Sequence, residues 1–208
     1  MSRAKTQSTT KSKLLDAAVN VIRAQGYSAT TVDDLCDSAG VTKGAFFHHF
    51  ESKEALGVSA AQHFASMAEG LFTSASYREL PDPVDRLLGY VALRKSLVQG
   101  ELAGFTCLFG TLVQETYQTH PAIREACASH LADHTAMLES DIAAALAKYA
   151  SHARWSASSL ASHMQAVIQG AFILAKAEES PAIAVDCLDH LRRYLEALFI
   201  RPQSKDLS

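Results

Sequence analysis

Cysteine and histidine are the residue types in this sequence that could carry catalysis or bind a metal, and their spacing forms few patterns. The chain of 208 residues has four cysteines and nine histidines. The cysteines are widely scattered and form no CxxC pair, which argues against a zinc finger or a disulfide framework and favours a reducing cytoplasm. No histidine forms an identifiable catalytic set with serine and aspartate, and no glycine-rich phosphate loop occurs. We therefore predict that the protein is not an enzyme and that it needs no cofactor.

Two histidines one helical turn apart come nearest to a metal site. His130 and His134 are four residues apart beside Asp133, a spacing that can place two imidazoles on one face of a helix. No HExxH motif and no third ligand accompany them. A surface position or a contact in a dimer is the simpler interpretation, so we predict no metal site.

The net charge of −3 does not by itself indicate a nucleic-acid-binding protein, because the first 55 residues carry nearly as many acidic as basic side chains. Any affinity for phosphates must come from a few well-placed cations and from helix N-termini. The sequence has no apolar run of 18 residues, which predicts no membrane span and no membrane partner. The polar N-terminus, MSRAKTQSTTKSK, has no apolar signal core, so a cytoplasmic location is expected.

Apolar residues recur at intervals of three and four throughout the chain, whereas no alternating strand pattern occurs. This periodicity predicts an all-α protein of about nine helices. The expected helices cover approximately residues 11–25, 32–39, 43–49, 52–76, 83–99, 104–117, 121–150, 156–177 and 181–199. We expect a helix-turn-helix domain at residues 1–55, a larger helical domain for ligand binding and dimerisation at 56–200, and a tail at 201–208.

The stretch 30–56 organises the rest of the chain, because it predicts two short helices joined by a tight turn. Thr30 or Thr31 can cap the first helix with its hydroxyl oxygen. Gly40 follows the last periodic residue, where a left-handed C-terminal position favours glycine, and Thr42 can cap the second helix. Two helices joined in this way form a helix-turn-helix, whose second helix fits the DNA major groove.

This stretch resembles the N-terminal DNA-binding domain of the TetR family of bacterial transcriptional regulators. The resemblance is carried by the segments AQGY, TTV, AGV, TKG, FHHF and SKEAL at residues 24–27, 30–32, 39–41, 42–44, 47–50 and 52–56. It covers about the first quarter of the chain and implies a homodimeric regulator of a palindromic operator in double-stranded DNA, with repression favoured over activation. The residues expected at the DNA are Thr30, Thr31, Thr42, Lys43, Gly44, Ala45, Phe47, His48 and Lys53.

Phe47 departs from the tyrosine that is common at the matching position of the family. It lacks the phenolic hydroxyl that could bind a phosphate, which leaves stacking or contact with a thymine methyl group. The pattern also allows Phe47 to lie in the core with Phe46 and Phe50, so its position stays open.

The last two expected helices carry alternating small and large apolar residues, which predicts a dimer seam. A monomeric head makes few DNA contacts, whereas a two-fold dimer presents two reading helices to a palindromic site. The resemblance to the family points to a four-helix bundle made by the same two helices of each copy. The residues expected in the seam are Leu160, Met164, Val167, Ala171, Leu174, Leu188, Leu191 and Leu195.

The helices after residue 56 are rich in apolar residues, which suits a cavity for a small-molecule effector that releases the DNA. The candidate lining residues are Phe64, Met67, Phe72, Leu93, Phe105, Cys107, Phe109, Val113, Tyr117, His134, Met137, Met164, Gln165 and Phe172. Gln114, Glu115, His134 or Trp155 could orient a ligand. Ordinary core packing is the competing interpretation for each of them.

The segment GFTCLFG at residues 104–110 resembles one branch of the TetR family, in which the matching cysteine of some members senses electrophiles or oxidants. We expect Cys107 one turn inside its helix, where the helix N-terminus favours the thiolate, although no Lys or Arg is close in sequence. A reactive sensor and a small buried hydrophobe both remain open. The alternative function for the whole chain is a small-molecule binding or sequestering protein with little DNA activity.

Overall fold

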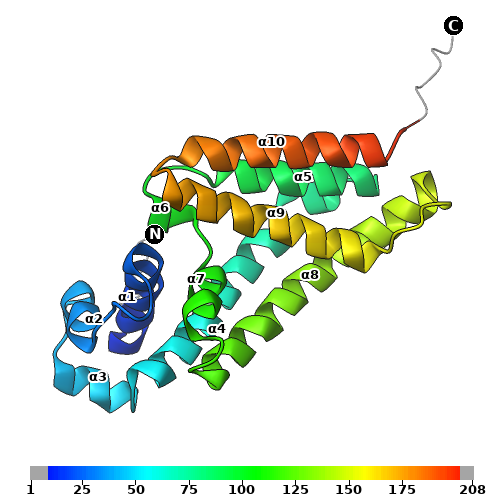
Figure 1. Cartoon of the computed structure of the whole chain (residues 1–208). Helices are drawn as coiled ribbons and strands as arrows, with labels where there is room; N and C mark the ends of the chain where they lie inside the picture. The colour runs from blue at the N-terminus through cyan, green and yellow to red at the C-terminus, as the bar shows by residue number, and fades with distance from the viewer. Residues whose placement is uncertain (1–8, 202–208) are drawn as a thin grey trace, which may run out of the picture. The chain divides into compact units, whose positions relative to one another are not determined.

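A computed structural model describes residues 9–201 of the protein (Figure 1). Over this range the chain forms ten α-helices and one 3-10 helix and contains no strand, so the all-α fold class predicted from the periodicity is confirmed. None of the helices in this range is long and apolar enough to cross a membrane. The predicted tail, 201–208, lies outside the described residues except for Arg201.

The helices follow one another with short connections. The first five elements are α1 (Thr10–Gln25), α2 (Val32–Ala39), α3 (Lys43–His49), α4 (Lys53–Thr73) and the 3-10 helix η1 (Ser76–Glu79). The remaining elements are α5 (Pro83–Ser96), α6 (Leu102–Phe105), α7 (Leu108–Thr116), α8 (Pro121–Tyr149), α9 (Ala157–Ala177) and α10 (Pro181–Leu198).

The helix expected over residues 104–117 is interrupted, and this corrects the position of Cys107. Cys107 has extended backbone angles, φ −85° and ψ 126°, and is the N-cap of α7. The four-residue helix α6 precedes it, and Thr106 and Cys107 separate the two helices. The Cys107 thiol therefore lies at the start of α7 and not one turn inside a longer helix.

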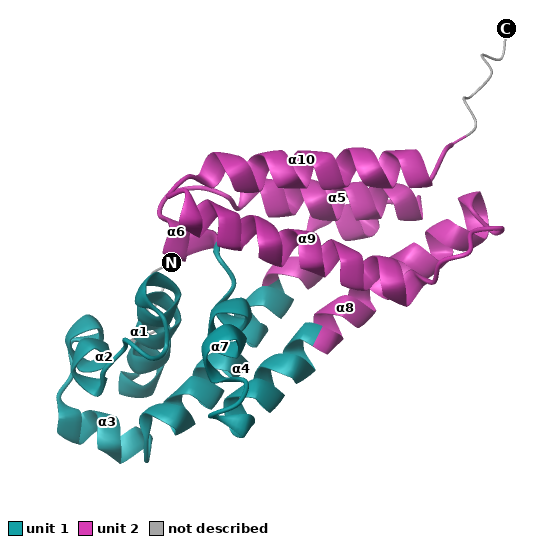
Figure 2. Cartoon of the chain, viewed as in Figure 1, with its two compact units in different colours: residues 1–70, 106–131 teal, residues 71–105, 132–208 magenta. Residues whose placement is uncertain are grey.

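The described helices form two compact units (Figure 2). The first unit contains the chain up to residue 70 and residues 106–131, and the second contains residues 71–105 and the chain from 132 onwards. Helices α4 and α8 contribute residues to both units. The first unit therefore includes α7 in addition to the three helices expected in the helix-turn-helix domain.

The core of the first unit joins α1, α2 and α3 to α7. Helix α1 packs against the other three helices. The buried apolar side chains of this core include Leu14, Ala18, Ile22, Leu35, Phe46, Phe50, Leu56, Leu108, Leu112 and Ile123. Burying one such large side chain contributes roughly 1.5–3 kcal/mol. Because α7 shares this core, a segment far along the chain helps to hold α3.

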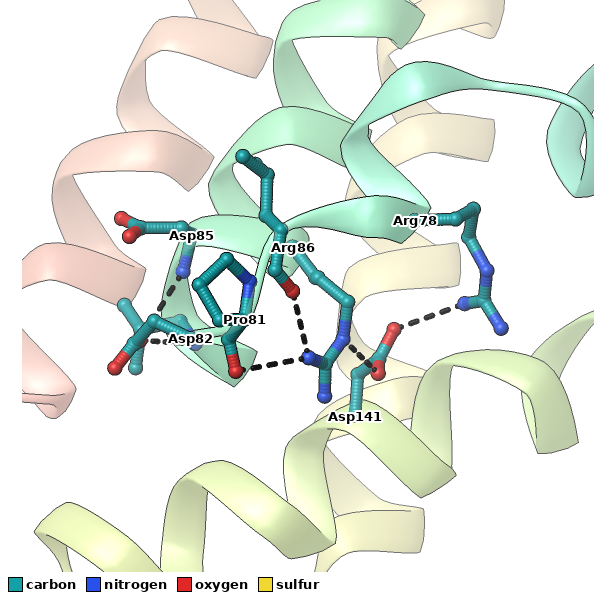
Figure 3. A network of polar contacts seen from close by, with 8 residues as sticks. Arg78, Pro81, Asp82, Asp85, Arg86 and Asp141 are labelled. Atoms are coloured by element: carbon teal, nitrogen blue, oxygen red, sulfur yellow. Dashed lines mark hydrogen bonds and ion pairs between the residues drawn. The ribbon is translucent and has the colours of Figure 1, made fainter.

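In the second unit, α10 packs against both α5 and α9. A buried carboxylate on α8 joins α8 to the segment before α5. Asp141 accepts hydrogen bonds from Arg78 Nη1 at 3.0 Å and Arg86 Nε at 2.7 Å, and Figure 3 shows the two arginines on either side of this carboxylate. Arg86 Nη1 also donates to the carbonyl oxygens of Leu80 and Pro81. The turn into α5 is thus fixed by charge-assisted hydrogen bonds.

Asp82 caps α5 and connects it to the end of α8. Its Oδ1 accepts hydrogen bonds from the amides of Val84, at 2.9 Å, and Asp85, at 3.4 Å. Its Oδ2 accepts from Lys148 Nζ at 2.8 Å and from the Tyr149 hydroxyl. Burial by itself would raise the pKa of Asp82, but these hydrogen bonds outweigh it and hold the pKa well below its ordinary value of 3.8.

We expect Asp82→Ala to lower the free energy of unfolding at pH 7 by about 2 kcal/mol, because it removes a helix cap and the partner of two side chains. Since the folded-state pKa lies below 3.8, the stabilisation is present above that pH and is lost as the pH falls through and below it. Wild type should therefore lose stability with falling pH more steeply than the variant. Denaturant unfolding from pH 7 to pH 3 measures both effects.

Asp85→Ala is the matched control for this prediction. Asp85 lies in the first turn of the same helix, and its ion pair with Arg201, at 2.7 Å, is partly exposed. Such a pair is worth about 1 kcal/mol or less. Equal losses of unfolding free energy in the two variants would show that the Asp82 hydrogen bonds stabilise the fold no more than the Asp85 ion pair does.

Candidate nucleic-acid interface

Helix α2 begins with a capping box that fixes its first turn. Thr31 Oγ1 accepts a hydrogen bond from the amide of Asp34 at 3.1 Å, and Asp34 Oδ2 accepts from the amide of Thr31 at 2.8 Å. The hydrogen bonds that the amide and the hydroxyl of Thr31 donate to the Asp34 carboxylate lower the pKa of Asp34. Of the two threonines that the sequence allowed as caps, Thr31 is the one used.

The turn between α2 and α3 depends on one left-handed residue. Gly40 has φ 64° and ψ 41°, a conformation that glycine adopts without steric cost. It lets the amide of Val41 donate to the carbonyl oxygen of Cys36 at 2.9 Å, which closes the end of α2. Thr42 then caps α3 by accepting from the amide of Ala45 at 3.2 Å. The direction of α3 is therefore set by backbone geometry at its start.

Helix α3 has one buried and one exposed side. Phe46 and Phe50 are buried, whereas Phe47 is 56% exposed, which resolves the position that the sequence left open. Lys43 and His48 are exposed as well. Seven of the predicted DNA-contact residues lie in this area. Thr31 is at the start of α2, and the others lie in α3 or directly before it: Thr42, Lys43, Gly44, Ala45, Phe47 and His48. A cation, an imidazole and an aromatic ring are groups that can contact phosphates and base edges.

Lys43 forms an ion pair with an acidic residue in the first turn of α2. Its Nζ lies 2.8 Å from Asp33 Oδ1, and both side chains are more than half exposed. The hydrogen bond to Asp33 raises the pKa of Lys43. An exposed ion pair is weak in water, so it can open when a phosphate or a base edge competes for the ammonium group. Asp33 also suits the first turn of α2, where the helix dipole favours a negative charge.

Two residues predicted at the DNA point inward. Thr30 is 1% exposed, and its hydroxyl donates to the carbonyl oxygen of Gly26 at 2.6 Å. Lys53 Nζ donates to the carbonyl oxygens of Tyr27 at 3.0 Å and Thr30 at 2.9 Å, and it lies 4.3 Å from the centre of the Tyr27 ring. These contacts offset the unfavourable position of a lysine at the start of α4. Both side chains therefore help to position the exposed side of α3 and do not belong to it.

Most of the predicted dimer seam lies in the core of the second unit. The buried members are Leu160, Met164, Ala171, Leu188, Leu191 and Leu195, whereas Val167 is half-buried and Leu174 is exposed. The regular apolar spacing marks the sides of α9 and α10 that pack within the chain, so these six side chains are unavailable to a second copy. The large apolar residues that these helices do expose are Ile173, Leu174 and Tyr194, which are 44–48% exposed.

The residues predicted to line a ligand cavity are divided between the two units. In the first unit, Phe64 and Phe109 meet edge to face with ring centres 5.1 Å apart. In the second unit, the ring centres of Phe105 and Phe172 are 6.0 Å apart. These contacts are those of ordinary aromatic core. Of the other candidates, Met137 is half-buried, and Met67 and Tyr117 are exposed.

The second unit carries an open groove of about 640 Å³ that the sequence did not predict. It is lined by Leu71, Ser74, Ala75, Ser76, Tyr77, Leu80, Gly89, Ala92, Leu93 and Ser96. Of the candidates for ligand binding named above, Leu93 alone belongs to this groove. The predicted set followed helical periodicity, whereas the groove follows the junction of η1 with α5.

His134 is a partly buried hydrogen-bond acceptor. Its Nε2 accepts from Arg94 Nη2 at 3.0 Å, since a guanidinium can only donate, and lies 2.9 Å from the Tyr90 hydroxyl. Burial, and secondly the charge of Arg94, lower the pKa of His134 to about 3, so the ring is neutral at pH 7. His130 stacks on the Phe109 ring at 5.6 Å. Among residues 9–201, no group of three or more His, Cys, Asp or Glu side chains is placed to hold a metal ion.

Cys107 has a cation beside it that its sequence neighbours did not reveal. Arg23 on α1 is buried, and its Nη1 donates to the carbonyl oxygen of Thr106 at 3.2 Å, across 83 residues of sequence. Burial lowers the pKa of Arg23, and the nearby Cys107 acts in the opposite direction. A nearby cation and a helix N-terminus are two features that reactive cysteines share. Cys127, another cysteine of the first unit, is fully buried, and burial raises its pKa to about 12.

Glu115 also has a place that the sequence did not predict. It was a candidate for orienting a ligand, but its carboxylate accepts hydrogen bonds from the amides of Tyr27 and Ser28, at 3.2 Å and 2.7 Å. The sequence carries no periodic or motif signal for such a contact, because 88 residues separate Glu115 from Tyr27.

Comparisons with known proteins match both parts of the chain. The family model described as "Bacterial regulatory proteins, tetR family" matches residues 14–60, and the one described as "Tetracyclin repressor-like, C-terminal domain" matches residues 83–193. The HTH-type transcriptional repressor DhaR of Mycobacterium sp. (strain GP1) is 32% identical over 111 residues, which are 53% of this chain and 54% of that repressor. The chain thus spans about half the length of this curated relative, and less of the next ones.

Solved structures resemble the fold over most of the chain. A TetR-family transcriptional regulator from Agrobacterium tumefaciens has a TM-score of 0.79 at 18% identity, with 89% of this chain and 96% of that chain covered. The reduced form of NemR from E. coli has a TM-score of 0.76 at 21% identity, with 94% and 100% covered. At these identities the likeness shows the fold alone. Together with the two family matches, it shows that the chain belongs to the TetR family of bacterial regulatory proteins.

Proposed function

We propose that the protein is a sequence-specific DNA-binding repressor whose reading helix is α3. The observation that carries this proposal is the division of α3 into a side buried through Phe46 and a side that exposes Lys43, Phe47 and His48. A helix held in this way can enter the major groove and present the residues of its first turns to base edges. The match to DhaR, which is named a transcriptional repressor, supports repression.

The contacts available to α3 define what it can read. Lys43 can donate to a guanine edge or a phosphate once its exposed pair with Asp33 opens. Phe47 offers no hydroxyl and is exposed, which suits apolar contact with a thymine methyl group. Because α3 carries one lysine and no arginine, it can release few counterions, and we expect the DNA affinity to fall only moderately with added salt.

The proposal includes a dimer on a palindromic operator. Ile173 and Leu174 on α9 and Tyr194 on α10 are large apolar residues with 44–48% exposure. Exposed apolar residues on two helices that pack against each other suit a contact with a second copy. A two-fold dimer places two reading helices on two half-sites of a palindrome.

The proposal also includes a small-molecule effector that releases the DNA, and Cys107 is its candidate receptor for an electrophile. Cys107 is a half-buried thiol at the N-cap of α7, and Arg23 binds the carbonyl oxygen of the residue that precedes it. The thiolate would add to an electron-poor carbon of the electrophile, and the adduct would lie where α7 meets α1. Release follows only if the adduct is accommodated better in the state that does not bind DNA.

The direct test is selection of DNA from a random pool by the purified full chain. Enrichment of an inverted repeat supports the repressor. If no sequence is enriched, the chain does not read DNA unaided, and the alternative of a small-molecule binding or sequestering protein takes first place.

On the enriched DNA, we expect Lys43→Ala and His48→Ala each to raise the Kd about tenfold or more, because a contact to a base edge is worth roughly 1–3 kcal/mol. Circular dichroism and thermal unfolding should stay unchanged, since both side chains are exposed. Lys176→Ala on α9 removes the same charge outside the first unit and should leave the affinity unchanged. Fluorescence anisotropy measures the affinity, and wild-type binding by both α3 variants would rule out α3 as the reading helix.

We expect N-ethylmaleimide to abolish binding of the enriched DNA by wild type and to spare Cys107→Ser. The Cys107 thiolate adds across the maleimide double bond, a proton from solvent completes the thioether, and the bulky adduct disturbs the start of α7. Cys187→Ser is the control, because Cys187 is a second half-buried thiol that lies in the other unit. Mass spectrometry identifies the modified residue, and a Cys107→Ser variant that remains sensitive would exclude Cys107 as the receptor.

A further inference from the structure

The turn between α1 and α2, residues 26–30, is held by two charged side chains from elsewhere in the first unit. Lys53 Nζ donates hydrogen bonds to the carbonyl oxygens of Tyr27 and Thr30. Glu115, in the last turn of α7, accepts hydrogen bonds from the backbone amides of Tyr27 and Ser28. The Lys53 ammonium group thus donates to backbone carbonyl oxygens of the turn, and the Glu115 carboxylate accepts from its backbone amides.

The Glu115 carboxylate binds two successive amides, one with each oxygen. Oε1 lies 3.2 Å from the amide nitrogen of Tyr27, and Oε2 lies 2.7 Å from that of Ser28. Hydrogen bonds to an ionised carboxylate are about twice as strong as neutral ones. Gly26 makes room for this contact, because a Cβ at its position would collide with Glu115 Oε1. The φ of Gly26, 90°, is also a backbone angle that residues with a side chain rarely adopt.

The turn leads directly into the reading head. Thr30 ends the turn with its hydroxyl on the carbonyl oxygen of Gly26, and the next residue, Thr31, is the N-cap of α2. Helix α2 in turn fixes α3 through the left-handed Gly40. A displacement of residues 26–30 therefore changes where α2 and α3 begin.

Helix α7 is fastened to α1 at both ends. At its start, Arg23 Nη1 donates to the carbonyl oxygen of Thr106 at 3.2 Å, and at its end Glu115 holds the turn that follows α1. Between these contacts, Leu108 and Leu112 are fully buried in the core that α7 shares with α1. Helix α7 therefore packs along α1, and Glu115 near the C-terminus of α7 holds the α1–α2 turn.

We propose that Glu115 is a positioning residue for DNA binding and that α7, through this carboxylate, sets the position of α2 and α3. The inference rests on the proposed function, because it assigns the regulation of the same DNA-binding surface. Glu115 is exposed, so its hydrogen bonds add little to global stability in competition with water. Their effect is to select one position of the turn. Without them the competent head is populated for a smaller fraction of the time, and the Kd rises in proportion.

The experiment compares wild type, Glu115→Gln and Glu115→Ala on the DNA enriched from the random pool. Glutamine keeps one acceptor oxygen and loses the charge, whereas alanine loses both acceptors. We expect the Kd to rise about tenfold in the alanine variant and less in the glutamine variant, with the denaturation midpoint unchanged. Hydrogen exchange should show that the amides of Tyr27 and Ser28 lose protection while amides in the middle of α1 keep theirs.

Gln114→Ala is the matched control, because Gln114 is the exposed neighbour on α7 whose side-chain amide donates only within its own helix, to Gly110. It should leave the Kd and the exchange of the turn amides unchanged. Wild-type DNA affinity in Glu115→Ala, with wild type binding the selected DNA, would overturn the inference and leave the proposed function intact. A fall in affinity that only follows a fall in global stability would also overturn it. If wild type binds no DNA, the proposed function fails and the inference falls with it.

Discussion

A helix of seven residues has no stability of its own in water, and α3 is such a helix. It exists because Phe46 is fully buried in a core that also contains Leu14, Leu35 and Leu112. Since one side of α3 must be apolar to keep the helix in place, only the opposite side is free to contact DNA. The core therefore decides both that α3 forms and which of its side chains can read a groove.

Apolar packing alone would leave the head free to shift, and three charged side chains limit this freedom. Lys53, Glu115 and Arg23 each bind backbone groups of distant segments within the first unit. Backbone partners fix the course of the chain itself, so these contacts specify the angle at which α2 and α3 leave α1. They also link the start of α7, where Cys107 lies, to the turn that precedes α2. A chemical change at Cys107 has a short physical route to the reading helix.

The local features of the fold could be predicted from the sequence, because helix caps, a left-handed glycine and helical periodicity each require recognisable residue types at fixed spacings. Thr31, Gly40 and Thr42 stand where capping and turn geometry require them. The inward direction of Thr30 and Lys53 could not be predicted, since it depends on carbonyl groups that the fold brings near. The leucines of α9 and α10 illustrate the same limit, because periodicity identifies an apolar side of a helix without saying which partner covers it. Contacts such as Glu115 with Tyr27 leave no periodic signal at all.

The measurement that tests the central claim most directly is methylation interference on the selected DNA. Dimethyl sulfate modifies guanine N7, which faces the major groove, and adenine N3, which faces the minor groove. If α3 of two copies reads a palindrome, interference should occur at guanines in two clusters that lie one helical turn or a multiple of a turn apart. Interference confined to adenines, or to a single cluster, would contradict a pair of reading helices in the major groove.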